Sequence, residues 1–345
     1  MMWHRATIKS HKKLSPTVTG LTLKLDKSNN TTNSSSSFTF SPGQWVDFQP
    51  SSSSWKPNQD GSKTIGGYSI TSIPSSLPYL ELAIQSSHHP VAEWITLYAK
   101  VDDCVNLRVG GSFTYTTTTT SSSSGRSTDD ETTKKQRILF VAGGVGINPL
   151  FSMIRQWYCY NIDQTTTECI DKTTTTTTTT TTTQQQSKRK AVLIYSAKRK
   201  EDLLFVSVLN DMMGDNFRVV LTTTTTTETA PSGIAALSRN KNDSFGNNDL
   251  KGNHNIEVKK GRIDHDMIQD AVCWMNTPND DDDEQTLKDD DEDDDDGDDM
   301  IVDLVYICGP PGMPEDIQRI LIPSQPNMGK RFVRSVDDVH YEKWW

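Results

Sequence analysis

The chain has 345 residues with 45 acidic and 35 basic side chains, which gives a formal net charge of −10. Fifteen of the acids and one Lys lie between Asp280 and Asp299, so the rest of the chain has a balance of +4. This excludes a uniformly acidic protein, and the mildly basic remainder suits an anionic dinucleotide ligand.

The five cysteines are scattered and odd in number, which argues against a disulfide framework and favours a reducing, intracellular compartment. No pair has metal-ligand spacing and no run of four could hold an iron–sulfur cluster, so we expect no metal site and no appended ferredoxin module. No apolar stretch reaches membrane-spanning length. We expect neither a membrane span nor a nucleic-acid partner, and the oligomeric state stays open.

Segments rich in Thr, Ser, Gln or Asp interrupt the chain and lack the apolar residues of a core. We expect a linker at 116–136 and disordered inserts at 165–187, 222–255 and 278–299. Surface loops accept extra length at small entropic cost, so these segments mark loops and not domains. The acidic run is expected to be a solvated loop, with binding of a basic partner as the alternative.

Residues 1–115 predict an all-β unit. Its expected strands are Ala6–Ser10, Val18–Leu25, Phe38–Phe40, Trp45–Gln49, Gly67–Thr71, Leu80–Gln85 and Val105–Val109. Strands at this spacing, with Gly, Pro and Ser between them, favour a small antiparallel barrel. Val91–Lys100 has helical spacing of its apolar residues and is expected to cross one barrel end.

The first 25 residues are basic and free of acid, which is typical of a mitochondrial presequence. The segment Ala6–Leu25 also predicts two strands of the barrel, and we favour the strands because cleavage would remove half a sheet. The compartment therefore stays open between cytoplasm and mitochondrion.

Residues 137–345 predict a second domain, in which strands alternate with helices. The expected strands are Ile138–Ala142, Ala191–Ala197, Phe217–Leu221 and Ile301–Cys308. The expected helices are Pro149–Tyr160, Glu201–Met213, Asp264–Asn276 and Pro314–Leu321. This alternation favours a doubly wound parallel sheet.

A glycine turn follows the first of these strands directly. Its glycines are Gly143, Gly144 and Gly146. They permit backbone angles that a Cβ forbids and allow a ligand to approach the main chain. We expect Asn148 to cap the next helix and Pro149 to take its first position, which leaves free amides for a pyrophosphate. An ordinary tight turn is the alternative.

Four ordered motifs carry a resemblance to the ferredoxin–NADP reductase superfamily. They are Gly-Gln-Trp-Val-Asp at 43–47, Tyr-Ser-Ile-Thr-Ser at 68–72, Gly-Gly-Val-Gly-Ile-Asn-Pro at 143–149 and Cys-Gly-Pro-Pro-Gly-Met at 308–313. Two further features are similar to the oxidoreductase NAD-binding domain-containing protein 1 group: a Gly-Gly before the aromatic-Ser pair, and the terminal Tyr-Glu-Lys-Trp-Trp at 341–345. The resemblance implies a flavin-binding-type barrel followed by an NAD(P)-binding domain.

The resemblance also implies the nicotinamide site. The implied cofactor-binding residues are Gly143, Gly144, Val145, Gly146, Ile147 and Asn148, together with Gly309 and Pro310. Cys308 would lie beside the nicotinamide ring as a catalytic residue, with a buried structural cysteine as the alternative. The basic run Lys198–Lys200 could contact a 2′-phosphate, but no dedicated clamp follows it. We therefore expect NAD, with NADP as the alternative.

The resemblance also implies an FAD site, but the sequence matches only part of the superfamily's flavin-binding pattern. In the superfamily an Arg two residues before the Tyr pairs with the flavin pyrophosphate, and here that position is Gly66. Tyr68 would pack on the flavin ring, Ser69 would bond to its reactive edge as a catalytic residue, and Ser72 is a further cofactor-binding candidate. Ala92 stands where a phosphate-binding hydroxyl is usual, and His88 and His89 either replace the lost charge or form a solvated turn. A smaller or loosely held flavin fits the same gaps.

At the C-terminus the resemblance implies that Glu342 is catalytic and that Trp344 or Trp345 stacks on the flavin. Closure of the domain seam by the two tryptophans is the alternative. The sequence thus predicts a flavin-linked NAD(P)H oxidoreductase with an unknown electron acceptor. The competing prediction is a non-catalytic dinucleotide-binding or scaffold module with a decayed flavin site.

Overall fold

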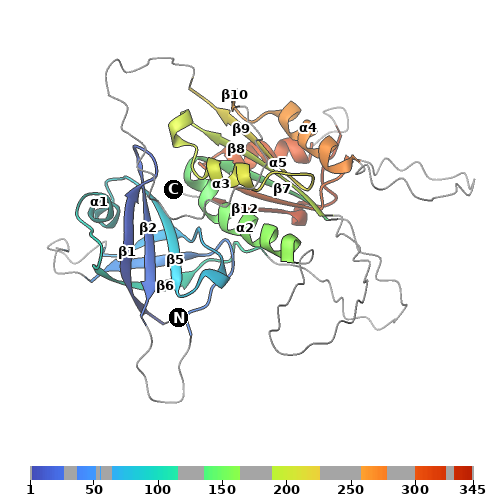
Figure 1. Cartoon of the computed structure of the whole chain (residues 1–345). Coiled ribbons are helices and arrows are strands. Elements are labelled where there is room, and N and C mark those ends of the chain that lie inside the picture. Colours follow the sequence, from blue (N-terminus) through green and yellow to red (C-terminus); the bar gives the residue numbers. More distant parts are fainter. Residues whose placement is uncertain are drawn as a thin grey trace, which may run out of the picture.

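The computed structural model describes residues 2–26, 37–51, 55, 64–115, 136–163, 189–225, 258–277, 300–323 and 330–343. These residues form two packed parts, a blue-to-cyan barrel and a green-to-red α/β unit (Figure 1). The predicted fold class, an antiparallel barrel followed by a doubly wound parallel sheet, is confirmed. Residues 116–135 of the predicted linker and most of the predicted inserts lie outside the described residues, whereas Gln136, the last residue of the predicted linker, begins a strand.

The barrel is a six-stranded antiparallel sheet in the order β4-β3-β6-β1-β2-β5. Its strands are β1 His4–Lys13, β2 Val18–Leu25, β3 Trp45–Pro50, β4 Gly66–Ser69, β5 Tyr79–Gln85 and β6 Cys104–Gly110. An isolated bridge between Ile70 and Leu82 joins the two outer strands, so the sheet nearly closes. Helix α1, Pro90–Leu97, buries Val91, Trp94 and Ile95 in the barrel core, as its apolar spacing predicts.

Residues 37–41 form no strand, so the strand predicted at Phe38–Phe40 is wrong. The two rings pack against each other with centroids 6.3 Å apart, and Phe38 meets the ring of His4 edge-on. The aromatic alternation therefore reflects side-chain packing at a barrel end and not backbone pairing.

The second part is a six-stranded parallel sheet in the order β10-β9-β8-β7-β11-β12. Its strands are β7 Gln136–Gly143, β8 Arg189–Ala197, β9 Phe217–Thr223, β10 Val258–Lys260, β11 Leu304–Gly309 and β12 Val339–Lys343. Helices α2 Ile147–Asp163 and α3 Val206–Asp211 pack in one core cluster, and α4 His265–Asn276 and α5 Met313–Leu321 pack in another. Alternate residues of β7 and β8 contribute to each cluster, because side chains of a strand point to opposite faces.

Two predicted segments need correction. The helix expected over Glu201–Met213 is a 3-10 turn at Lys200–Asp202 followed by the short α3. Phe205, between them, has a left-handed φ of 61°, and its ring stacks on Phe151 of α2 at 4.1 Å. Residues 222 and 223 belong to β9 and are buried, so the insert predicted from 222 begins too early.

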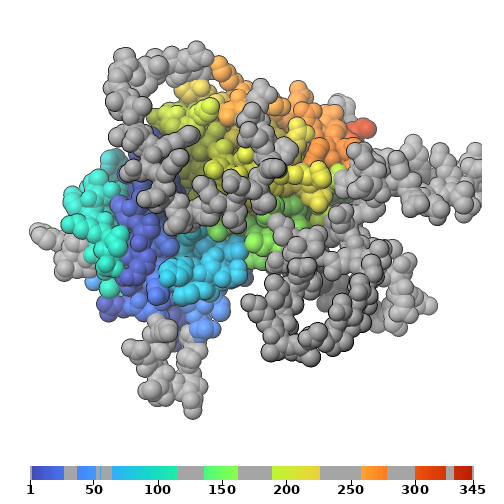
Figure 2. Space-filling model, viewed as in Figure 1, coloured from blue at the N-terminus to red at the C-terminus, as the bar shows by residue number. Residues whose placement is uncertain are grey.

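Helix α2 joins the two parts. It lies between the barrel and the parallel sheet, and in the space-filling view cyan barrel atoms lie directly against green atoms of α2 (Figures 1 and 2). The core cluster on this face of the sheet includes Val18, Ala83, Phe113 and Tyr115 of the barrel part. One continuous apolar core therefore fixes the barrel against the carboxyl ends of the parallel strands.

Candidate active site at the domain seam

The glycine turn and the Cys-Gly-Pro motif pack directly on each other. A Cβ on Gly146 would lie 2.5 Å from the carbonyl carbon of Cys308, and a Cβ on Gly143 would lie 2.5 Å from the sulfur of Met313. Gly144 has a left-handed φ of +55°, and a Cβ there would meet nothing within 4 Å. The turn is thus closed on the side of β11 and open on the other side, where a ligand can approach the main chain.

Asn148 does not cap α2, so that prediction is wrong. The helix begins at Ile147, and the Asn148 side chain donates from Nδ2 to the carbonyl oxygen of Ala83 in the barrel, at 2.8 Å. Its Oδ1 is buried without a hydrogen-bond partner. The first turn of α2 therefore faces the barrel strand β5, and this residue connects the two parts.

Two further polar contacts continue along α2. The Ser152 hydroxyl donates to the carbonyl oxygen of Ser72 at 2.6 Å, and Arg155 donates to Glu81 at 2.7 Å and to the carbonyl oxygen of Thr71 at 3.3 Å. The Ser72 hydroxyl itself accepts from the backbone N–H of Glu81 at 3.1 Å. Both oxygens of the predicted cofactor residue Ser72 are thus used within the protein.

Cys308 and Glu342 are neighbours on β11 and β12, where they form a parallel register pair. Paired residues point to the same face of a sheet, and Cys308 belongs to the core cluster that contains α2 and the barrel residue Phe113. Cys308 is fully buried. The structure brings these two predicted residues together, while a contact of the Cys308 thiol with nicotinamide stays a prediction.

The carboxyl group of Glu342 lies at a cavity of about 320 Å³ between β12 and the segment that leaves the barrel. The lining residues are Ser112, Phe113, Thr114, Val339, His340, Tyr341 and Glu342. Burial raises the pKa of Glu342 to about 7, and its Oε2 is buried without a hydrogen-bond partner. A carboxyl group that titrates near neutral pH at a cavity is a candidate proton donor and acceptor.

The predicted flavin residues Tyr68 and Ser69 point to opposite faces of β4. Tyr68 is half-buried against the barrel core, with its ring centroid 5.9 Å from that of Phe48. Ser69 is buried and pairs with Trp45 of β3 on the other face. Ser69 therefore shares its sheet face with the indole of Trp45. The sequence did not single out Trp45 as a site residue, although it lies inside the 43–47 motif.

The residues around β4 and α1 do not fit a flavin diphosphate. A Cβ on Gly66 would lie 2.5 Å from the Tyr68 hydroxyl oxygen, so the phenol ring occupies the space beside this position. Ala92 is buried in the barrel core, and Pro90 at the start of α1 has no N–H. His89 precedes the helix and makes no side-chain cap.

The basic run after β8 is partly neutralised by acids of the same turn. Arg199 donates to the two carboxylate oxygens of Asp202 at 2.9 and 3.1 Å and lies 3.3 Å from Glu201. A 2′-phosphate at this position would compete with two carboxylates for the guanidinium group.

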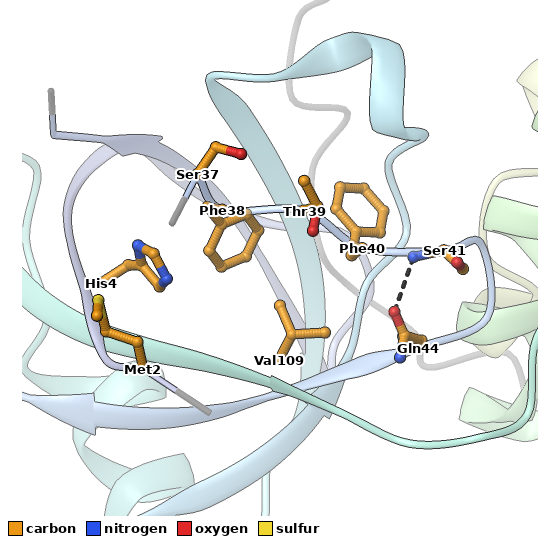
Figure 3. A pocket seen from close by; sticks show the side chains of 9 residues that line it. All are labelled: Met2, His4, Ser37, Phe38, Thr39, Phe40, Ser41, Gln44 and Val109. Carbon is orange, nitrogen blue, oxygen red and sulfur yellow. Dashed lines mark hydrogen bonds between the residues drawn. The ribbon is translucent and has the colours of Figure 1, made fainter. Parts of the chain in front are cut away.

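A cavity of about 400 Å³ lies at the barrel end opposite α1 and was not foreseen (Figure 3). Its walls include His4, Phe38, Phe40 and Val109, and Gln44 closes one side, where it accepts from the Ser41 N–H at 2.7 Å. The one sequence feature associated with this cavity is the pair of aromatic residues Phe38 and Phe40.

Trp344 and Trp345 lie outside the described residues. Among the residues that the structure describes, no helix combines the length and apolar character of a membrane span. In the same described ranges, no three His, Cys, Asp or Glu side chains gather as metal ligands. Of the other predicted residues, Ile147 is fully buried, Gly309 is buried, Val145 is half-buried and Pro310 is exposed.

No protein-family profile matches the chain. Among curated proteins, Oxidoreductase NAD-binding domain-containing protein 1 of Danio rerio is 38% identical over 120 residues, which are 34% of this chain and 37% of that protein. The Homo sapiens protein of the same name is 35% identical over 121 residues, 32% of its length. The chain thus covers about a third of the length of these relatives.

Solved reductase structures share the fold. The chain matches a ferredoxin NADP+ reductase from Neisseria gonorrhoeae with bound FAD and NADP at a TM-score of 0.54 and 15% identity, over 99% of each chain. It matches the FAD/NAD binding domain of a nitric oxide dioxygenase from Vibrio cholerae at a TM-score of 0.52 and 14% identity, over 99% and 98% of the two chains. The chain therefore has the two-domain fold of ferredoxin–NADP reductase-like proteins and resembles Oxidoreductase NAD-binding domain-containing protein 1 in sequence.

Proposed function

We propose that this chain is an NAD(P)H-dependent oxidoreductase that passes hydride from nicotinamide to a flavin, with electrons leaving to a further acceptor. One observation carries the proposal: the glycine turn packs on the Cys308–Met313 segment at the carboxyl edge of the parallel sheet, which faces the barrel. Dinucleotides bind at this edge in doubly wound sheets. The names of the relatives and the cofactors bound in the solved neighbours support the same class of reaction.

The proposed roles follow from position. The open side of Gly144 and the amides at the start of α2 hold the nicotinamide dinucleotide. Cys308 and Glu342 border the seam from the sheet, and Ser69 borders it from the barrel. Glu342, with its pKa near 7, holds or releases a proton there. A bound flavin would supply a two-electron acceptor.

Arg199 and its two acidic partners support NADH as the reductant, because the guanidinium group is already engaged. A second function is favoured by the unsuitable diphosphate position at Gly66 and Ala92. In that case the chain binds NADH but performs no hydride transfer.

The two functions are distinguished by adding NADH anaerobically to the full-length protein with an equimolar flavin and recording the visible spectrum. Bleaching of the flavin absorption that depends on the protein is expected. NADH binding without bleaching would support the non-catalytic module instead.

A matched pair of variants tests the cofactor turn. Gly144→Ala and Gly261→Ala both place a Cβ at a left-handed φ, +55° and +120°, with nothing within 4 Å. The conformational cost is about 1–2 kcal/mol at +55°, inside the left-handed well, and larger at +120°, outside it, so Gly261→Ala is the more severe backbone control. We expect weaker NADH binding, by about tenfold or more, for Gly144→Ala alone.

A further inference from the structure

We propose that this protein takes flavin as an exchangeable substrate that it recognises by the ring system and not by a diphosphate. The inference rests on the proposed function and specifies its second substrate. FAD, FMN and riboflavin would then bind with similar affinities and all be reduced. Three features of the barrel carry the argument.

The first feature is the position of Tyr68. Its ring leans back along β4, where a Cβ on Gly66 would lie 2.5 Å from the hydroxyl oxygen and 2.8 Å from two ring carbons. The ring is held there edge-on by Phe48 in the barrel core. Burial raises the pKa of the Tyr68 hydroxyl, so the group is neutral. Space that a cationic side chain at position 66 would need is filled by a neutral phenol.

The second feature is the charge along this side of the barrel. Strands β4 and β5 and helix α1 contain no Lys or Arg, and they carry two carboxylates, Glu93 and Glu81, of which Glu81 is paired with Arg155 of α2. The side chains of Val91 and Ala92 in the first turn of α1 are buried and offer no hydroxyl. A diphosphate is held by charge-assisted hydrogen bonds, and apart from His88 and His89 before α1 these elements present no candidate cation. The phosphate groups of FAD therefore contribute little to its binding affinity at these elements.

The third feature is an aromatic surface on the sheet face that Ser69 shares. The indole of Trp45 lies over the main chain of Gly110 and Gly111, where added Cβ atoms would lie 2.6 and 2.7 Å from its ring atoms. Side chains at these two positions would displace the indole, so the glycines allow it to lie flat on the sheet. Trp45 is half-buried and shares its sheet face with Ser69. An indole and a hydroxyl on one sheet face suit a planar, hydrogen-bonding ring system.

Trp45 also lies close to the domain seam. A Cβ on the neighbouring Gly43 would collide with Met153 of α2 and with the carbonyl oxygen of Phe113. Phe113 lines the cavity at Glu342. The proposed ring site therefore borders the same seam as the nicotinamide site, which hydride transfer requires.

The reaction is balanced without a further reactant. A hydride, carrying two electrons, leaves C4 of the dihydronicotinamide and forms a bond to N5 of the flavin, while a proton from water adds at N1. NAD+ and the dihydroflavin are released, and the dihydroflavin carries the electrons to the final acceptor. No tightly held flavin is needed between turnovers.

The test measures dissociation constants of FAD, FMN and riboflavin with the full-length, flavin-free protein by quenching of flavin fluorescence. NADH oxidation is then followed at increasing concentrations of each flavin. We expect the three constants to agree within about threefold, and each flavin to be reduced with a similar KM. A protein that retains FAD through gel filtration, or binds it about a hundredfold more tightly than riboflavin, overturns the inference but leaves the proposed function standing. Absence of binding by any flavin overturns both.

The ring site has its own test. Trp45→Leu is expected to weaken binding of all three flavins by the same factor, about tenfold for one aromatic stacking contact. Trp274→Leu on α4, across the parallel sheet, is the matched control and should leave the flavin constants unchanged. Selective loss of FAD binding in Trp45→Leu would contradict recognition by the ring. If the Trp45→Leu protein does not fold, Trp45→Phe is used. A smaller loss of affinity is then expected, and it should be the same for all three flavins.

Discussion

The carboxyl group of Glu342 gives a prediction whose size follows from the structure. Burial raises its pKa from 4.5 to about 7, so between these values the folded chain binds more protons than the unfolded chain. Stability must then fall as pH rises from 4.5 through 7. At 1.36 kcal/mol per pKa unit the limit is about 3 kcal/mol, which screening of this half-buried group reduces to about 1–2 kcal/mol.

Glu342→Gln removes this ionisation and keeps the shape of the side chain. The Tm of the variant relative to that of the wild type is expected to be about 2–8 °C higher at pH 8.5 than at pH 5. Thermal unfolding followed by circular dichroism measures it. Comparing variant with wild type at each pH cancels the contributions that the two proteins share, and Asp211→Asn at an exposed position is the control. An unchanged difference at the two pH values, or a larger one at pH 5, would refute a buried, destabilised carboxylate.

Three other predictions concern packing and charge. Gly146→Ala places a Cβ against the main chain of β11, which has no flexible side chain to yield, so a loss of about 3 kcal/mol or more in urea unfolding is expected; a loss near 1 kcal/mol would argue against the close approach. Arg155→Met breaks the ion pair with Glu81 across the domain seam and should cost about 1–2 kcal/mol, most of it restored by Arg155→Lys. Asp202→Asn removes one of the two acidic partners of Arg199 and leaves Glu201. The dissociation constant for NADPH, measured by tryptophan fluorescence, should fall about fivefold while that for NADH stays the same; an equal change for both would exclude a contact with the 2′-phosphate.

Local patterns predicted those elements whose side chains respond to short-range periodicity. The βα alternation, the barrel and the turn at Gly143–Gly146 follow from apolar spacing and glycine positions. The resemblance implied a role for Cys308 and a role for Glu342, but their pairing was not predicted, because no local pattern reports which strands are neighbours. The parallel β12 supplies that contact from the far end of the chain.

The misplaced features depend on contacts between distant segments. Asn148 has the sequence environment of a helix cap, but its acceptor is the Ala83 carbonyl oxygen, 65 residues earlier. The predicted helix after β8 breaks because Phe205 turns into a left-handed conformation and stacks on Phe151. Tyr68 fills the space beside Gly66, and this could not be predicted either. A glycine in the sequence does not show which side chain occupies the space that its missing side chain leaves.

The bonds of α2 to the barrel have a mechanical consequence. Asn148, Ser152 and Arg155 lie on successive turns of the helix and are all anchored on the barrel main chain. Opening the seam like a hinge would break these bonds, at about 1 kcal/mol each, and also split the shared apolar core. The helix therefore holds the barrel and the parallel sheet, between which the proposed cofactor site lies, at a constant distance from each other. Under the proposed function, nicotinamide and flavin then reach the site by displacement of side chains, while the domains keep their relative position.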